Sequence, residues 1–230
     1  MSLLGLLPPI PTTLHGMTTI DRALQRLGNQ LPLAERQRAL PPGYARIHQA
    51  ILDSFARVGA PPARADLVEM ANTDPDSILE RLAADDFVVL DGGTVVGAYP
   101  FTLEATPHRL VIEGEVELNA MCSLDAVAVA PVFGCDVEIR SSCAVTGVPI
   151  RILQRGSSVL DADPGGLRLG IRWLEPTGCA AHSMCREMVF LSGAETAAGW
   201  RGPDPDAAGI YDLADGIEFG ARFFGPLLRG

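Results

Sequence analysis

The sequence predicts an α+β protein in which a winged-helix-like unit of three helices precedes a mostly antiparallel β core with short helices. Two patterns support this prediction. Apolar residues recur at helical spacing in the first part of the chain, and after Pro107 they fall into short runs typical of strands. Apolar residues make up 47% of the 230 residues and charged residues 20%. That composition is sufficient for a sizeable buried core.

Residues 1–42 form a lead-in rich in proline and leucine, with one helix expected from Thr18 to Leu27 and a second near Leu33 to Leu40. Its apolar start lacks a basic segment and is interrupted by prolines, so we expect no signal peptide. No run approaches the roughly 18 apolar residues that would suggest a membrane span. The five cysteines are odd in number and irregularly spaced, which indicates reduced thiols. We therefore expect a cytoplasmic protein.

Residues 43–106 are predicted to form the winged-helix-like domain. Apolar positions from Ile47 to Val58 have helical spacing, and Gly59 ends that helix. A second helix is expected over residues 63–71, and a third opens at Asp74-Pro75, where aspartate can cap and proline suits the first turn. Two apolar runs, 87–90 and 94–99, flank the turn at residues 91–93 and predict a β-hairpin.

The third helix of this unit argues against DNA binding. It has a single basic residue, Arg81, among acidic side chains at positions 74, 76, 80, 85 and 86. The whole chain carries a formal net charge of −10. A helix that enters a DNA groove needs the opposite charge, and neutralising phosphates needs clustered cations. We therefore expect neither nucleic acid nor a membrane as a partner, and interpret the unit as a scaffold.

Residues 107–230 are predicted to be a thiol-bearing catalytic core. Strands are expected at residues 109–112, 115–118, 135–140, 147–153, 167–174 and 188–191. A short apolar helix from Ser123 to Val129 should end before Pro131, because proline breaks a helix interior. A closing helix is expected from Ile210 to about Phe224. There is no glycine-rich phosphate loop in a strand-to-helix setting and no Gly-x-Ser-x-Gly motif.

Cys122 and Asp125 form the first candidate site. On a helix, side chains three residues apart share one face, and a thiol at a helix N-terminus ionises more easily. Thiolates select soft metals, and a carboxyl group beside them can accept or deliver a proton. A Cys-x-x-Asp pair is a weak signal by itself. A buried cysteine beside an aspartate of the first helical turn is the structural alternative.

Other cysteines allow further interpretations. Cys143 lies in a polar turn and is interpreted as structural, with a supporting role near the site as the alternative. Cys179, His182, Met184 and Cys185 lie close together in the sequence and are suitable ligand types for Zn or Cu(I). A structural zinc site needs four ligands, however, and no second Cys-x-x-Cys pair is present. His182 could instead be an exposed or satisfied histidine and Met184 a core residue.

Over Tyr44 to Gly220 the chain resembles the organomercurial lyases, also called alkylmercury lyases. The resemblance is carried by Cys122-Ser-Leu-Asp125, by residues 142–149 (Ser-Cys-Ala-Val-Thr-Gly-Val-Pro) and by the cysteine before an aromatic strand, Cys185 to Phe190. It implies that Cys122 and Cys185 bind mercury, that Asp125 serves the proton transfer, and that Cys143 is structural. It also implies cleavage of the carbon–mercury bond by protonolysis without a cofactor, since mercury is itself substrate and product.

The resemblance further implies an organomercurial substrate, a released hydrocarbon, and transfer of Hg(II) to cellular thiols or a mercury-handling reductase. Three departures matter, and one is a proline-rich lead-in longer than expected. Met121 stands where an aromatic residue is often found, and Met184 stands where a phenylalanine commonly precedes the second cysteine. The departure at Met184 leaves the register of this cysteine open by one residue. Whether Cys179 or Cys185 is the second thiolate is also open. A non-catalytic protein that binds Cu(I), Zn or Hg on a lyase-like fold remains the alternative function, and the preference for alkyl or aryl substrates is open.

Overall fold

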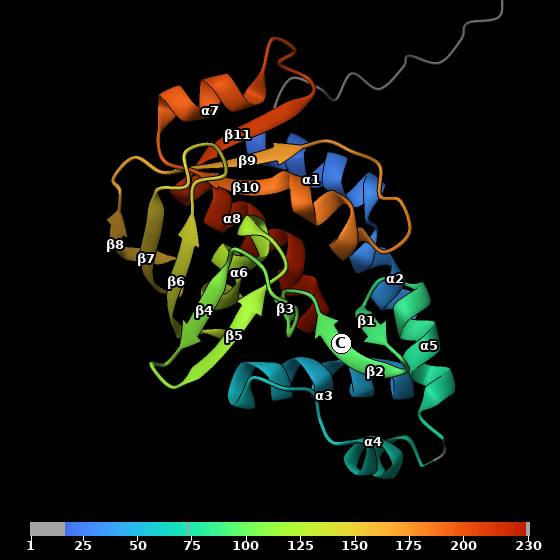
Figure 1. Cartoon of the computed structure of the whole chain (residues 1–230). Coiled ribbons are helices and arrows are strands. Elements are labelled where there is room, and N and C mark those ends of the chain that lie inside the picture. Colours follow the sequence, from blue (N-terminus) through green and yellow to red (C-terminus); the bar gives the residue numbers. More distant parts are fainter. Residues whose placement is uncertain (1–16, 73, 229–230) are drawn as a thin grey trace, which may run out of the picture.

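A computed structural model of the chain describes residues 17–72 and 74–228 (Figure 1). The segment on which the signal-peptide expectation rests lies outside the described residues. Helices occupy α1 (Thr19–Gln30), α2 (Leu33–Ala39), α3 (Pro42–Val58), α4 (Arg64–Ala71), α5 (Asp76–Ala84), α6 (Ser123–Phe133), α7 (Ala194–Arg201) and α8 (Leu213–Phe224), with short 3-10 helices η1 (Ala180–His182), η2 (Met184–Glu187) and η3 (Gly225–Leu228). No helix in this part of the chain is long and apolar enough to span a membrane.

The strands form two antiparallel sheets. They are β1 (Val88–Asp91), β2 (Thr94–Ala98), β3 (Phe101–Thr102), β4 (Arg109–Ile112), β5 (Val116–Ala120), β6 (Asp136–Ser142), β7 (Pro149–Arg155), β8 (Ser158–Asp163), β9 (Arg168–Arg172), β10 (Met188–Leu191) and β11 (Ala208–Asp212). The larger sheet has the order β1-β2-β3-β5-β4-β6-β7-β8, and the smaller has the order β10-β9-β11. Every pairing between these strands is antiparallel, which confirms the predicted α+β class.

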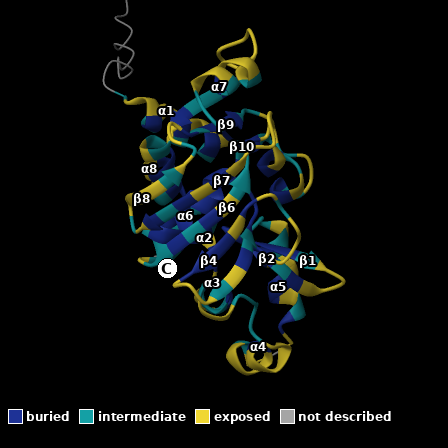
Figure 2. Cartoon of the chain, turned by 60° about the vertical axis from the view of Figure 1, so that its left-hand side comes forward, coloured by how far each residue is buried: buried dark blue, intermediate teal, exposed yellow. Residues whose placement is uncertain are grey.

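Helices α6 and α8 lie between the two sheets (Figure 1). The residues of α6 from Ser123 to Ala130 are all buried, so the helix has no solvent-facing side over this stretch (Figure 2). The two helices pack closely at Gly220, where a Cβ atom would lie 2.9 Å from the Cβ of Ala128 and 3.0 Å from the carbonyl oxygen of Leu124. The start of α6 is therefore fixed in the centre of the molecule.

Helix α6 continues through Pro131 to Phe133, so the prediction that it ends before this proline is wrong. Proline has no N–H to donate to the carbonyl four residues earlier, which here belongs to Val127. The buried side chain of Gln154 on β7 fills that role, because its Nε2 donates to the Val127 carbonyl oxygen at 2.9 Å. A side chain distant in sequence thus satisfies the group that the proline leaves free.

The closing helix begins at Leu213, not at Ile210 as predicted. Residues 208–212 instead pair with β9 as the outer strand β11. Asp212 ends that strand and caps α8, since its Oδ1 accepts a hydrogen bond from the backbone N–H of Asp215 at 2.9 Å. Strand β8 and helix α7 were not among the predicted elements.

The predicted helices and hairpin of residues 43–106 are present as α3, α4, α5, β1 and β2. Their interpretation as a winged-helix-like domain stays a prediction, as does the domain division at residue 106. The hairpin is joined to the core, because β3 pairs with both β2 and β5 and so continues the larger sheet across that boundary. In the described part of the lead-in, α1 packs on α8, and Asp21 forms an ion pair with Arg222 at 2.7 Å.

Candidate active site

Cys122, Asp125 and Cys185 lie together in the core of the molecule. Cys122 is the N-cap of α6, and its Sγ accepts a hydrogen bond from the backbone N–H of Asp125 at 3.4 Å. Cys185 comes from η2, just before β10. One ligand atom from each of the three residues lies within 4.8 Å of the other two. These are the three site residues named from the sequence, and the structure brings all of them together.

All three side chains are buried, with relative exposures of 1%, 0% and 3% for Cys122, Asp125 and Cys185. Neither carboxyl oxygen of Asp125 has a hydrogen-bond partner within the described residues. An unpaired carboxylate is costly in such surroundings. Burial therefore raises the pKa of Asp125 well above its ordinary value, and the nearby Cys122 adds to the effect. Burial thus favours the protonated form of this carboxyl group.

The thiols are also held in their protonated form. Burial raises the pKa of Cys122 well above the ordinary thiol value, and its hydrogen bond with Cys185 adds to this. For Cys185 the hydrogen bond with Cys122 acts in the opposite direction, but burial and the proximity of Asp125 leave its pKa raised. Metal binding to a thiol releases its proton. A thiophilic metal that enters this site therefore liberates protons next to a carboxyl group able to carry them.

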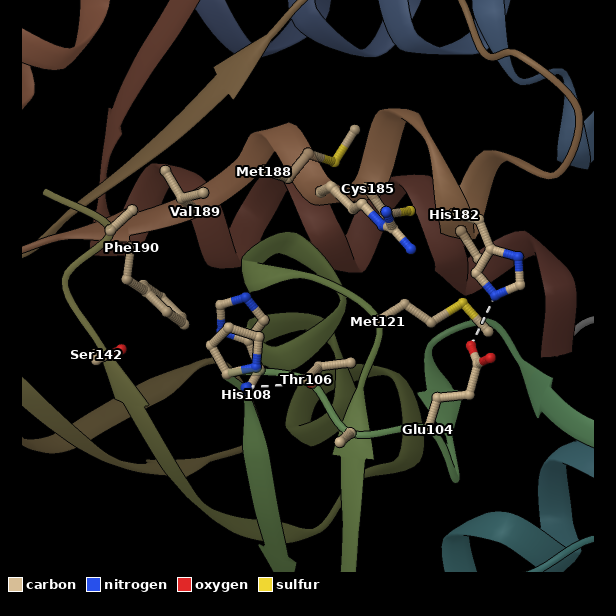
Figure 3. A pocket seen from close by; sticks show the side chains of 15 residues that line it. Glu104, Thr106, His108, Met121, Ser142, His182, Cys185, Met188, Val189 and Phe190 are labelled. Atoms are coloured by element: carbon tan, nitrogen blue, oxygen red, sulfur yellow. Dashed lines mark hydrogen bonds and ion pairs between the residues drawn. The ribbon is translucent and has the colours of Figure 1, made fainter. Parts of the chain in front are cut away.

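A cavity of about 680 Å³ reaches the site from one side. Cys185 is on its wall, with Met188 and Val189 continuing along β10 toward Phe190 (Figure 3). Cys122 and Asp125 are not on the wall. The other lining residues are Glu104, Ala105, Thr106, Pro107, His108, Met121, Ser142, Ala144, Ala181, His182 and Arg186. The wall thus combines apolar side chains with polar and charged ones, and the space is large enough for a small organic group.

His108 lines this cavity, although its segment looks peripheral in the sequence. Its Nδ1 lies 2.9 Å from Ser141 Oγ, and its ring meets Phe190 edge-on with centroids 5.5 Å apart. Burial lowers the pKa of His108 to about 4, so the ring is neutral near pH 7. It stands after a proline and belongs to no motif, so no local signal identified it; only the pairing of β4 with β6 brings it to the site.

The alternative ligands near Cys185 do not converge on one point. His182 Nε2 lies 2.7 Å from Glu104 Oε2, and both side chains are almost half exposed. Met184 is buried at 1% exposure, as expected for a core residue. Within the part of the chain that the structure describes, the cluster of metal-ligating side chains contains neither Cys179 nor His182. Cys185, and not Cys179, is the thiol adjacent to Cys122.

Cys143 also lies outside this cluster. Its Sγ accepts a hydrogen bond from the backbone N–H of Ser192 at 3.3 Å, and the next residue, Ala144, donates its N–H to the Phe190 carbonyl at 3.0 Å. Burial opposes ionisation of this thiol, but hydrogen bonds from Ser192 and Thr146 lower its pKa to about 6. These contacts hold the turn after β6 against β10, which carries part of the cavity wall.

The comparisons with known proteins agree with this arrangement. The family model for alkylmercury lyase (MerB) matches residues 101–225, more than half of the chain. The chain belongs to the alkylmercury lyase family. The predicted family and the predicted enzyme class are thereby confirmed.

Members of the alkylmercury lyase family with curated descriptions include two informative relatives. An alkylmercury lyase from Streptomyces lividans is 22% identical over 211 residues, covering 92% of this chain and 97% of the relative. One from Staphylococcus epidermidis is 29% identical over 128 residues, covering 56% of this chain and 58% of the relative. The crystal structure of the mercury-bound form of MerB2 matches with a TM-score of 0.72 at 21% identity, over 87% of this chain and 99% of that chain. This last likeness supports the shared fold.

Proposed function

We propose that the chain cleaves the carbon–mercury bond of organomercurials by protonolysis, with Cys122 and Cys185 as mercury ligands and Asp125 as the proton carrier. The observation that supports this most directly is the buried group of two thiols and one carboxyl, with ligand atoms within 4.8 Å of one another. Soft thiolates supply the affinity for mercury. The raised pKa of Asp125 supplies a protonated acid where the carbon–metal bond would break.

The proposed reaction balances without an external reagent. An organomercurial R–Hg–SR′ enters the cavity and exchanges onto Cys122, which gives its proton to the departing thiol R′SH. The Cys185 sulfur then binds the metal, and its proton replaces the one that Asp125 gives to carbon. Electron density pushed through mercury by the two sulfurs makes the bound carbon basic, and Asp125 delivers the proton to it. The hydrocarbon R–H leaves, and Hg(II) stays bridged between the two thiolates.

No cofactor takes part in this scheme, because the ligands come from the chain and the metal from the substrate. Hg(II) held by two thiolates dissociates slowly by itself, so we propose that small cellular thiols or a mercury-handling reductase remove it by thiol exchange. The cytoplasm, where thiols are kept reduced, stays the expected compartment.

The test is the release of benzene from phenylmercury by the reduced protein in excess thiol, measured in the headspace. We expect benzene from the wild type and none above background from Cys122→Ala. Asp125→Asn should lower the rate by roughly 10²–10⁴-fold, the usual contribution of a general acid. It should still bind Hg(II), because both sulfurs remain. Asp91→Asn, an exposed residue at the tip of the β1–β2 hairpin, is the matched control and should act like the wild type.

The outcomes separate the two candidate functions. Mercury bound by the wild type without any benzene would leave only the soft-metal binding protein. Loss of activity in Cys179→Ala, with Cys185→Ala still active, would show that the second thiolate has been assigned to the wrong cysteine.

A further inference from the structure

A third sulfur atom lies beside the two thiols. The Sδ of Met188 is 3.6 Å from the Sγ of Cys122, a contact within hydrogen-bonding range for sulfur. Met188 is buried, with 3% of its surface exposed, and it lines the cavity together with Cys185. Cys122 does not line the cavity. A ligand moving from the cavity to Cys122 therefore meets Cys185 and Met188 at the boundary.

The local backbone explains why Cys185 and Met188 share this boundary. Cys185 belongs to the 3-10 helix η2, and Met188 is its C-cap. Side chains three residues apart in a 3-10 helix lie on the same side, because each turn contains three residues. Figure 3 shows the two residues next to each other along this segment. The contact with Cys122 lies where α6 packs against β10, because Cys122 is the N-cap of α6 and Met188 begins β10.

We propose that Met188 Sδ is a third sulfur contact for the mercury that Cys122 and Cys185 bind. A thioether is a soft, neutral ligand that need not lose a proton to bind. In a site that already holds two thiolates and a carboxyl, a neutral donor adds affinity without adding buried negative charge. This inference rests on the proposed function, because it takes Cys122 and Cys185 as the primary ligands.

The contact has a functional consequence for the product. Hg(II) on two thiolates remains open to attack by an incoming thiol, and a third sulfur near the metal retards that exchange. Replacing Met188 by leucine keeps the apolar volume nearly the same while it removes the sulfur. We expect the affinity for Hg(II) to fall by about tenfold, at the lower end of the loss seen when a supporting group of a metal site is removed.

The first test detects the contact itself. Protein labelled with selenomethionine is loaded with inorganic Hg(II), and scattering from selenium is sought in the mercury X-ray absorption spectrum. We expect a mercury–selenium contribution in the wild type and in Met121→Leu, the other methionine on the cavity wall. The contribution should be absent from Met188→Leu. A selenium signal that persists in Met188→Leu, or is missing from the wild type, would overturn the proposal.

The second test measures how strongly each variant retains Hg(II). Each variant, loaded with one equivalent of Hg(II), is titrated with a competing dithiol, after thermal unfolding has shown that it is folded. Met188→Leu should release mercury at about tenfold lower dithiol than Met121→Leu; equal release would contradict the proposal. Neither measurement needs carbon–mercury cleavage. Failure of the benzene assay would therefore reject the proposed function, whereas failure here would reject only the role of Met188.

Discussion

At the scale of single residues, burial without hydrogen-bond partners shifts the pKa values of two ionisable side chains. Asp125 and His48 illustrate two outcomes of the same physical situation. Asp125 has no partner for its carboxyl oxygens among the described residues, and burial raises its pKa, which favours the protonated form. His48 on α3 has no partner for either ring nitrogen in the same part of the chain, and burial lowers its pKa to about 4. Both groups are driven toward their neutral forms.

The His48 environment predicts a loss of stability in acid. A histidine whose pKa falls from 6.5 to about 4 on folding stabilises the fold fully above pH 6.5, and this stabilisation is lost as the pH falls toward 4. This difference in pKa between the unfolded and folded states corresponds to about 3 kcal/mol of unfolding free energy. Leucine cannot be protonated, so His48→Leu should lose less stability than the wild type by about that amount. Urea unfolding at a series of pH values measures it.

His182→Asn serves as the control for this prediction. His182 is almost half exposed, so this variant shows whether replacing a histidine outside the core changes the pH dependence. A His48→Leu protein that loses stability in acid as steeply as the wild type would show that His48 is not the group responsible.

At the scale of elements, the stability of helix α6 around Pro131 depends on Gln154, a side chain of the larger sheet. Gln154→Leu leaves the buried Val127 carbonyl without a donor, which should cost about 1–3 kcal/mol. The cost should shrink in a Pro131→Ala background, because the alanine N–H can then donate to the same carbonyl. The measurement is a double-mutant cycle of unfolding free energies. Additive effects, with no coupling between positions 131 and 154, would contradict this account.

Elements with regular local patterns were predictable from the sequence, and elements that depend on distant partners were not. The periodicity around Ile51 predicted α3, and the Asp-Gly-Gly turn predicted the β1–β2 hairpin. The end of α6 was wrong because Gln154 stabilises the helix from outside. Strand β8 is mostly exposed on both faces, so it has no alternation to detect. Strand β11 runs directly into α8, which hid the boundary between them.

The residues of the candidate site also fall into those that the sequence predicts and those that it does not. The spacing of Cys122 and Asp125 placed both on one helical turn, as the structure shows. Cys185 was named through the resemblance to the family, because nothing in its spacing relates it to Cys122. Met188 lies one 3-10 turn after Cys185, but no motif marks it, and His108 enters the site only through the pairing of β4 with β6. No window of the sequence contains that information.

At the scale of the whole molecule, the continuity of the larger sheet bears on how the protein unfolds. β3 links the hairpin of residues 88–98 to β5, and α3 also packs against β5. We therefore expect one cooperative unfolding transition. Fluorescence of Trp173 and Trp200 reports on the part after residue 107, and hydrogen exchange of α3 amides reports on the part before it. The two urea midpoints should coincide.

Loss of protection in α3 at clearly lower urea would instead show that residues 43–106 unfold as a separate domain. That outcome would support the division predicted from the sequence, whereas coincident transitions would favour a single folding unit.

The N-cap position of α6 has a consequence for attempts to engineer this protein. Helices prefer serine, threonine, aspartate or asparagine at the N-cap, and here the position is occupied by the thiol of Cys122. Cys122→Ser would offer the helix a stronger acceptor while removing the thiol that we propose as a mercury ligand. A library selected only for heat resistance should therefore enrich serine at this position and discard the chemistry. If the proposed role of Cys122 holds, selection for stability and selection for activity favour different residues at this position.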